Sequence, residues 1–157
     1  MEQKYAASAI IYNDQGLVLL ARRSPTKYPF PNILSLPSTY IRGSDKNLVR
    51  ELVSDEKSQE QLRAAVMNKL GIDLKFKGLI GRKSGKQADY YLTMSDYFAQ
   101  IIGGALIPNQ EDFTEANFYD PLELFKGKDR TKMGFCTQIL LGTLERDPKF
   151  WREYLFI

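Results

Sequence analysis

Residues 58–72 read SQEQLRAAVMNKLGI and combine a helical pattern with signals for both of its ends. Apolar residues recur at every fourth position, at Leu62, Val66 and Leu70, which places them on one helical face. Ser58 is a typical N-cap residue, and glycine, here at position 71, is the residue type that most often ends a helix. The stretch therefore predicts an amphipathic helix that ends at Gly71 and leads directly into a strand.

The segments before this helix predict strands, an irregular region and a second helix. Residues 5–12 (YAASAIIY) and 17–22 (LVLLAR) are apolar and flank a typical turn, so we expect a hairpin. Prolines within residues 24–37 favour an irregular or extended chain there. Residues 45–53 (DKNLVRELV) have apolar side chains at helical spacing behind Asp45, a suitable N-cap, and we expect a short helix.

The segments after Gly71 predict several strands. Residues 72–80 alternate apolar and polar side chains, and residues 90–94 and 97–102 are rich in strand-forming types. Residues 81–86 (GRKSGK), between the first two of these strands, predict a mobile hairpin loop. Residues 110–115 (QEDFTE) predict an acidic loop before a short strand that begins at Asn117.

The C-terminal part predicts helices. We expect a short helix at 121–125, a charged linker at 126–132 and a longer helix at 134–146. The apolar end, residues 150–156, should dock on the domain or on a second copy of the chain. This order indicates an α+β fold with a mixed sheet between helices. A length of 157 residues suits one domain, with a core over about 4–125 and a C-terminal helical extension over about 133–157.

The composition excludes several kinds of site. The chain has no histidine, which excludes a Ser-His-Asp triad, a Cys-His dyad and a histidine-ligated metal. Cys136 is the single cysteine, so no internal disulfide or zinc cluster can form, and we interpret it as an inert core residue. The net charge of +3 favours anionic ligands weakly and gives no clear nucleic-acid signal. No apolar run suggests a membrane span or a signal peptide, so we expect a cytoplasmic protein without a membrane partner.

Taken together, the order and the local sequence of these segments resemble the Nudix (MutT-like) hydrolases over about residues 4–125. The matching segments are GLVLLARR at 16–23, NILSLP at 32–37, the helix and Gly-Ile pair at 58–72, GGAL at 103–106 and ANF at 116–118. The resemblance implies the Nudix α/β/α sandwich, a mixed β-sheet between helices, here with an added C-terminal helix.

The catalytic box of the family, G-x5-E-x7-R-E-U-x-E-E-x-G-U with U a bulky apolar residue, holds Mg²⁺ through glutamates on one helical face. If its closing pair is Gly71-Ile72, the metal glutamates become Ala65, Asn68 and Lys69, while the earlier glutamate is retained as Glu56. An insertion around residues 40–57 then precedes the box helix. Mg²⁺ needs oxygen ligands, and a lysine repels it, so this alignment predicts a degenerate box that binds no metal.

A second alignment places the box on Arg50-Glu51-Leu52-Val53-Ser54-Asp55-Glu56. Glu51 and Asp55 would then lie one helical turn apart, and these two residues and Glu56 could share Mg²⁺. Lys57 would replace the closing glycine, and a further helix would be needed before the next strand. We therefore prefer the first alignment.

The candidate site residues each have a functional and a structural interpretation. Glu56 and Glu111 are candidates for catalysis, or are a solvated helix start and a solvated acidic loop. Arg22, Arg23 and Lys69 are candidates for binding an anionic ligand. The arginines could instead cover a sheet edge, and the lysine could be a solvated residue at a helix end. The aromatic residues that could stack a base, or belong to the core, are Tyr28, Phe30, Tyr40, Tyr90 and Tyr91.

The leading functional hypothesis is a Nudix-like protein without the metal glutamates. It would bind a nucleotide-like or phosphorylated ligand, or a protein partner in a regulatory or structural role, without efficient hydrolysis and without a cofactor. The alternative is an active Mg²⁺-dependent hydrolase that cleaves a nucleoside diphosphate linked to another moiety through relocated carboxylates. The resemblance also suggests a homodimer.

Overall fold

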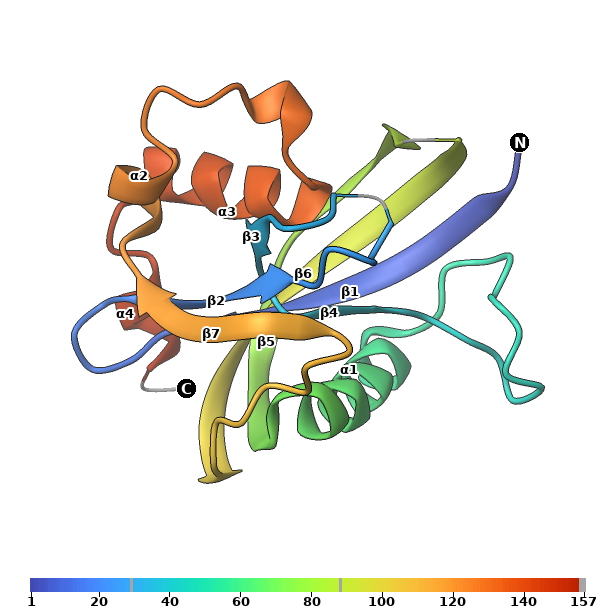
Figure 1. The fold of residues 1–157 in the computed structure, drawn as a ribbon, viewed down its shortest axis with the longest axis horizontal. Helices are drawn as coiled ribbons and strands as arrows, with labels where there is room; N and C mark the ends of the chain where they lie inside the picture. The colour runs from blue at the N-terminus through green and yellow to red at the C-terminus, as the bar shows by residue number, and fades with distance from the viewer. Residues whose placement is uncertain (29, 88, 156–157) are drawn as a thin grey trace.

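The computed structural model describes residues 1–28, 30–87 and 89–155 (Figure 1). Its strands are β1 (Gln3–Ile11), β2 (Val18–Arg23), β3 (Leu34–Ser35), β4 (Ser38–Tyr40), β5 (Ile72–Gln87), β6 (Tyr90–Gly104) and β7 (Phe113–Tyr119). Its helices are α1 (Asp55–Leu70), α2 (Pro121–Leu124), the 3-10 helix η1 (Arg130–Lys132), α3 (Phe135–Arg146) and α4 (Trp151–Tyr154). Pro29 and Phe156, to which two of the sequence predictions extend, lie outside the described residues.

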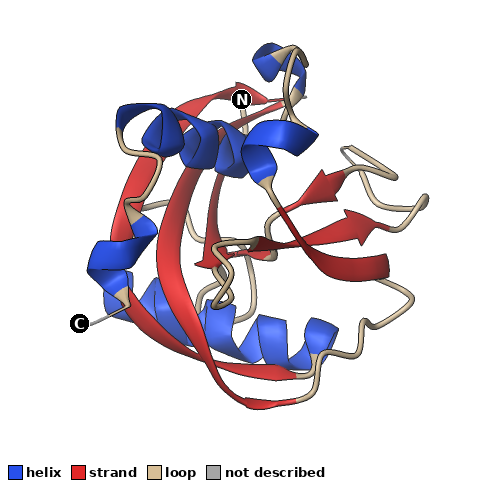
Figure 2. Cartoon of the chain, turned by 90° about the vertical axis from the view of Figure 1, so that its left-hand side faces the viewer, coloured by secondary structure: helices blue, strands red, loops and turns tan. Residues whose placement is uncertain are grey.

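The strands form two sheets between helical layers. One sheet has the order β4-β1-β6-β5, in which β1 and β6 are parallel and the other pairs are antiparallel. The other has the order β3-β2-β7 and is antiparallel. Figure 2 shows α3 on one side of the long strands and α1 on the other. Apolar side chains fill both interfaces, among them Phe98 and Leu140 toward α3, and Leu62 and Tyr97 toward α1. The α/β/α arrangement with mixed strands is confirmed.

The predicted hairpin is wrong, because β1 and β2 belong to different sheets. A single bridge between Tyr12 and Val18 joins them across the turn. Both edges of β1 are already occupied, by β4 on one side and β6 on the other. Strand β2 therefore pairs with β3 and β7 instead.

Helix α1 confirms the apolar face and the C-terminal end predicted from the sequence. Gly71 adopts a left-handed φ of 77°, and a Cβ atom there would lie 2.5 Å from the carbonyl oxygen of Ala105, so glycine is required twice over. The N-terminal prediction is wrong. The cap is Ser54, whose side chain accepts the backbone N–H of Lys57, and Ser58 lies inside the helix with 3% of its surface exposed.

The predicted helix at 45–53 is also wrong, because a turn occupies its start. The carboxylate of Asp45 accepts the backbone N–H of Asn47 at 3.0 Å, and Lys46 has a φ of 66°, outside the helical region. Val49 and Val53 still pack on the α1 side of the core, which explains their apolar character without a helix.

Residues 81–86 are strand rather than the predicted loop, and residues 90–102 form one strand rather than two. Register shifts within β5 let this long strand pair with β6 along its length. The glycines that suggested a loop lie beneath α3. A Cβ atom would lie 2.9 Å from the side chain of Ile139 at Gly81, and 3.1 Å from that of Phe135 at Gly85. Their small size allows α3 to approach the sheet.

The helical C-terminus is confirmed, and its described part docks on the domain. Phe150 is buried, and the Trp151 ring stacks on that of Tyr12 with 5.5 Å between centroids. Within the described residues, no helix has the length and apolar composition that crossing a membrane requires.

Candidate functional site

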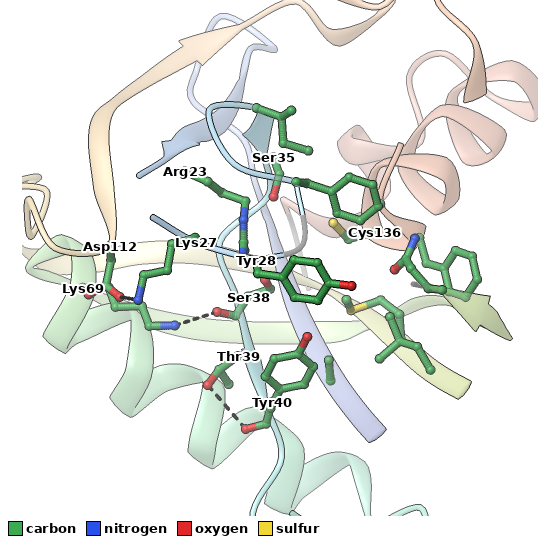
Figure 3. A pocket seen from close by; sticks show the side chains of 18 of the residues that line it. Arg23, Lys27, Tyr28, Ser35, Ser38, Thr39, Tyr40, Lys69, Asp112 and Cys136 are labelled. Carbon is green, nitrogen blue, oxygen red and sulfur yellow. Dashed lines mark hydrogen bonds and ion pairs between the residues drawn. The ribbon is translucent and has the colours of Figure 1, made fainter. Parts of the chain in front are cut away.

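A cavity of about 340 Å³ opens where several parts of the chain meet. These parts include the loop after β2, strand β4, the last turn of α1, the first half of β6, the start of β7 and the start of α3 (Figure 3). The polar lining residues include Arg23, Lys27, Ser35, Ser38, Thr39, Arg42, Lys69, Gln87 and Asp112. The aromatic lining residues are Tyr28, Phe30, Tyr40, Tyr90, Phe113 and Phe135. We call this cavity the basic pocket.

Four cationic side chains line the basic pocket, and Asp112 is the carboxylate among its described lining residues. Nζ of Lys27 pairs with Oδ1 of Asp112 at 3.0 Å. The guanidinium of Arg42 donates to the carbonyl of Lys46 at 3.3 Å. Nε of Arg23 is buried without a hydrogen-bond partner in the described structure. Positive charge therefore exceeds negative charge in the pocket, as anion binding requires.

Lys69 extends from the last turn of α1 into the basic pocket. Its Nζ donates to the carbonyl oxygen of Ser38 at 3.1 Å (Figure 3). Burial lowers the pKa of Lys69, and the charges of Lys27, Arg23 and Arg42 act in the same direction, while Asp112 opposes them. The predicted solvated lysine at a helix end is thus a largely buried amine among like charges.

Aromatic rings form the other wall. The hydroxyls of Tyr40 and Tyr90 share a hydrogen bond of 2.9 Å, and their rings meet edge to face. Burial, together with this hydrogen bond, raises the pKa of Tyr90, so its hydroxyl stays neutral. Tyr28 lies at the mouth with 68% of its surface exposed, although it lines the pocket. Such rings offer faces on which a planar ligand can stack.

The fold is that of known hydrolases, although no family model and no curated protein matches the sequence. The chain is similar in structure to the MutT protein from Methanosarcina mazei Go1, with a TM-score of 0.68 and 15% identity over 94% of this chain and 96% of that one. It is also similar to a MutT NUDIX hydrolase from Burkholderia pseudomallei, with a TM-score of 0.66 and 18% identity over 92% of this chain and 99% of that one.

A third similar structure is an ADP-ribose pyrophosphatase from Streptococcus suis, with a TM-score of 0.58 and 16% identity over 94% of this chain and 93% of that one. All three similarities extend over nearly the whole chain. The protein has the Nudix fold.

Within this Nudix fold, only two of the three predicted ligand-binding residues line the basic pocket. Arg23 and Lys69 line the basic pocket, whereas Arg22 lies outside it, because consecutive strand residues point to opposite faces. Nε of Arg22 pairs with Glu115 at 3.1 Å, and its Nη1 donates to the carbonyl of Asn32. Of the aromatic candidates, all but Tyr91 line the pocket.

The predicted acidic residues do not meet there. Glu56 is exposed in the first turn of α1, and the 13 residues to Lys69 correspond to about 20 Å along the helix. Glu111 is exposed in the turn before β7 and does not line the pocket. Its neighbour Asp112 does, and the predicted acidic loop drew attention to this segment without separating the two.

The residues of the second alignment are also apart from the pocket. Glu51 precedes α1, so it shares no helical turn with Asp55. Asp55 accepts hydrogen bonds at 2.7 Å from both Arg82 and the hydroxyl of Tyr97. In the described ranges, no group of three or more Asp, Glu or Cys side chains could hold a metal ion. The donor set therefore does not fit the Mg²⁺ that the fold implies.

Lys27 and Arg42 are residues of the site that the sequence did not indicate. Lys27 lies in a proline-rich loop, and Arg42 precedes a segment that we interpreted as a helix. These residues come from separate loops, and only the fold brings them to one cavity.

Proposed function

We propose that the protein binds a phosphorylated ligand with a planar ring, such as a nucleotide, and that it holds this ligand without a divalent metal. The observation that carries the proposal is the convergence of four cationic side chains beside aromatic rings in one cavity of a Nudix fold. Efficient metal-assisted hydrolysis is not part of this proposal.

The cationic groups suit a phosphate. Arginine binds phosphate oxygens with paired N–H groups, and lysine binds them as a compact charge. The Nε of Arg23 is buried without a hydrogen-bond partner in the described structure, and the Lys69 amine lies among three further cations. A bound anion would accept a hydrogen bond from the first and reduce the repulsion on the second. The cavity volume of about 340 Å³ lies within the range of small-molecule sites.

The positions on α1 support binding without metal. The alignment on Gly71 assigns Ala65, Asn68 and Lys69 to the places of the metal glutamates, and α1 ends at that glycine as the alignment requires. Alanine supplies no ligand, Asn68 is exposed, and Lys69 brings a positive charge into the pocket. We infer that cationic side chains of the pocket neutralise the phosphate, where related proteins would use a metal ion.

A thermal-shift assay tests the proposal with AMP, ADP and ADP-ribose, each in Mg²⁺ and in a chelator. At a ligand concentration of about 100 times Kd, the stabilisation is about 2.7 kcal/mol, which corresponds to a Tm increase of about 5–10 °C for a chain of this size. We expect the increase in both buffers, and none with adenosine, which lacks the phosphate.

Two other outcomes would redirect the interpretation. Stabilisation that requires Mg²⁺, accompanied by release of a monophosphate, would favour the hydrolase alternative. No response to any phosphorylated compound would contradict ligand binding in the basic pocket and would favour a protein partner.

A further inference from the structure

We propose that Lys69 is a nucleophilic amine that captures the carbonyl group of a phosphorylated aldehyde or ketone as an imine. This inference rests on the proposed function for its phosphate-binding groups, and it adds a reversible covalent step and a narrower ligand class. The geometry that carries it is an amine inside a cavity in which Arg23 and Arg42 remain available for the phosphate.

The surroundings of Lys69 increase the share of the neutral amine, which is the nucleophilic form. An ammonium group has three N–H donors, but within the described residues the acceptor for Nζ is the carbonyl of Ser38. Lys27, Arg23 and Arg42 oppose a further positive charge, and the opposing carboxylate of Asp112 is already paired with Lys27. Burial acts in the same direction on the pKa. A lysine that is desolvated near other cations is a recognised type of activated nucleophile.

The pocket also contains a group that can move protons. Figure 3 shows the Lys69 amine beside the Lys27–Asp112 pair. The amine lone pair attacks the carbonyl carbon, a C–N bond forms, and the oxygen takes a proton to give a carbinolamine. The C–O bond then breaks, water leaves, and nitrogen gives up its proton to form the C=N bond. The products are the imine and one water molecule, with no oxidant or reductant, and Asp112 can carry the protons.

The remaining groups select the ligand. If Lys69 bonds to the carbonyl carbon, Arg23 and Arg42 are left to hold the phosphate, and the rings of Tyr40 and Tyr90 are left to contact the body of the ligand. The structure thus predicts a strong preference for carbonyl compounds that also carry a phosphate.

The experiment uses pyridoxal 5′-phosphate, a phosphorylated aromatic aldehyde, at one equivalent, followed by borohydride reduction and peptide mapping. We expect one dominant adduct, at Lys69 among the 13 lysines of the chain, because a lowered pKa leaves more of its amine neutral and because Arg23 and Arg42 can hold the phosphate of the reagent. Selectivity for Lys69 should increase as the pH falls from about 9 to about 7, since exposed amines become protonated first. Pyridoxal, which lacks the phosphate, should label Lys69 much more weakly than the phosphorylated reagent does.

Two variants provide the matched comparison. Lys69→Arg should lose the adduct, whereas Lys57→Arg, an exposed position on the same helix, should retain it. Should Lys69→Arg fail to fold, the peptide map of the natural chain still decides. Label spread over exposed lysines, or equal labelling by pyridoxal, would overturn the inference. Nucleotide stabilisation without selective labelling would refute the imine alone, and selective labelling without nucleotide stabilisation would refute the nucleotide ligand alone.

Discussion

Replacing Asp96 with asparagine should stabilise the protein, and the gain should depend on pH. Asp96 lies in the middle of β6 with no exposed surface, and neither carboxylate oxygen has a hydrogen-bond partner in the described structure. Burial raises the pKa of this carboxyl group well above its ordinary value. The native state therefore retains the proton over a pH range in which the unfolded chain has released it.

The size of the effect follows from this difference. A carboxyl group whose folded pKa is raised costs nothing below the unfolded pKa, and it reduces stability as the pH rises above that value. Each pH unit above about 3.9 costs about 1.4 kcal/mol while the native state remains protonated, which gives a ceiling of about 4 kcal/mol at pH 7. Asparagine has nearly the same shape and stays neutral, so Asp96→Asn should stabilise the protein at pH 7, by no more than this ceiling, and should add almost nothing near pH 4.

Urea unfolding at about pH 4, 5.5 and 7 measures the prediction directly, through the midpoint at unchanged slope. The control is Asp14→Asn, since Asp14 is exposed in the turn after β1 and should show no comparable dependence on pH. A gain that is equal at all three pH values, or a loss at pH 7, would refute the conclusion that a neutral carboxyl group is buried at this position.

Three further substitutions test α1 and the pocket by urea unfolding. Gly71→Ala should lose about 2–4 kcal/mol, because of the positive φ and the nearby carbonyl of Ala105, and a loss below about 0.5 kcal/mol would contradict that geometry. Ser54→Ala should lose about 1 kcal/mol, whereas an equal loss from Glu60→Ala, exposed on the same helix, would argue against a specific cap. Lys69→Met should stabilise the unliganded protein by about 1 kcal/mol at neutral pH, because burial of the ammonium is costly, while nucleotide binding weakens. Since the pKa of Lys69 is lowered in the native state, natural stability rises with pH toward about 10, so this gain should shrink there, and a constant gain would contradict the burial argument.

The fold could be predicted from sequence where local signals and tertiary packing agree. The apolar positions of α1 and the glycine that ends it carry a clear local signal and also fit the tertiary packing. The position of the strand that begins after Gly71 could be predicted from them. The prediction of local structure failed where a residue type is explained by tertiary packing and not by secondary structure. Val49 and Val53 are apolar because they pack on the α1 side of the core, not because they lie on a helix. Gly81 and Gly85 suggested a loop, yet their missing side chains make room for α3.

The candidate site could be predicted only in part, for a similar reason. Arg23 and Lys69 were found because they lie beside recognisable elements. Lys27, Arg42 and Asp112 come from loops whose positions depend on the whole fold, and no spacing along the chain connects them. The burial of Lys69 likewise depends on the segments around it rather than on its place in the helix.

The most direct test of the account is the affinity of ADP measured by titration calorimetry, once in a chelator and once in excess Mg²⁺. If cationic side chains rather than a metal hold the phosphate, Kd should agree within about threefold between the two buffers, and it should rise with added salt as screened charge interactions weaken. Binding that is absent in the chelator and appears with Mg²⁺ would contradict the account.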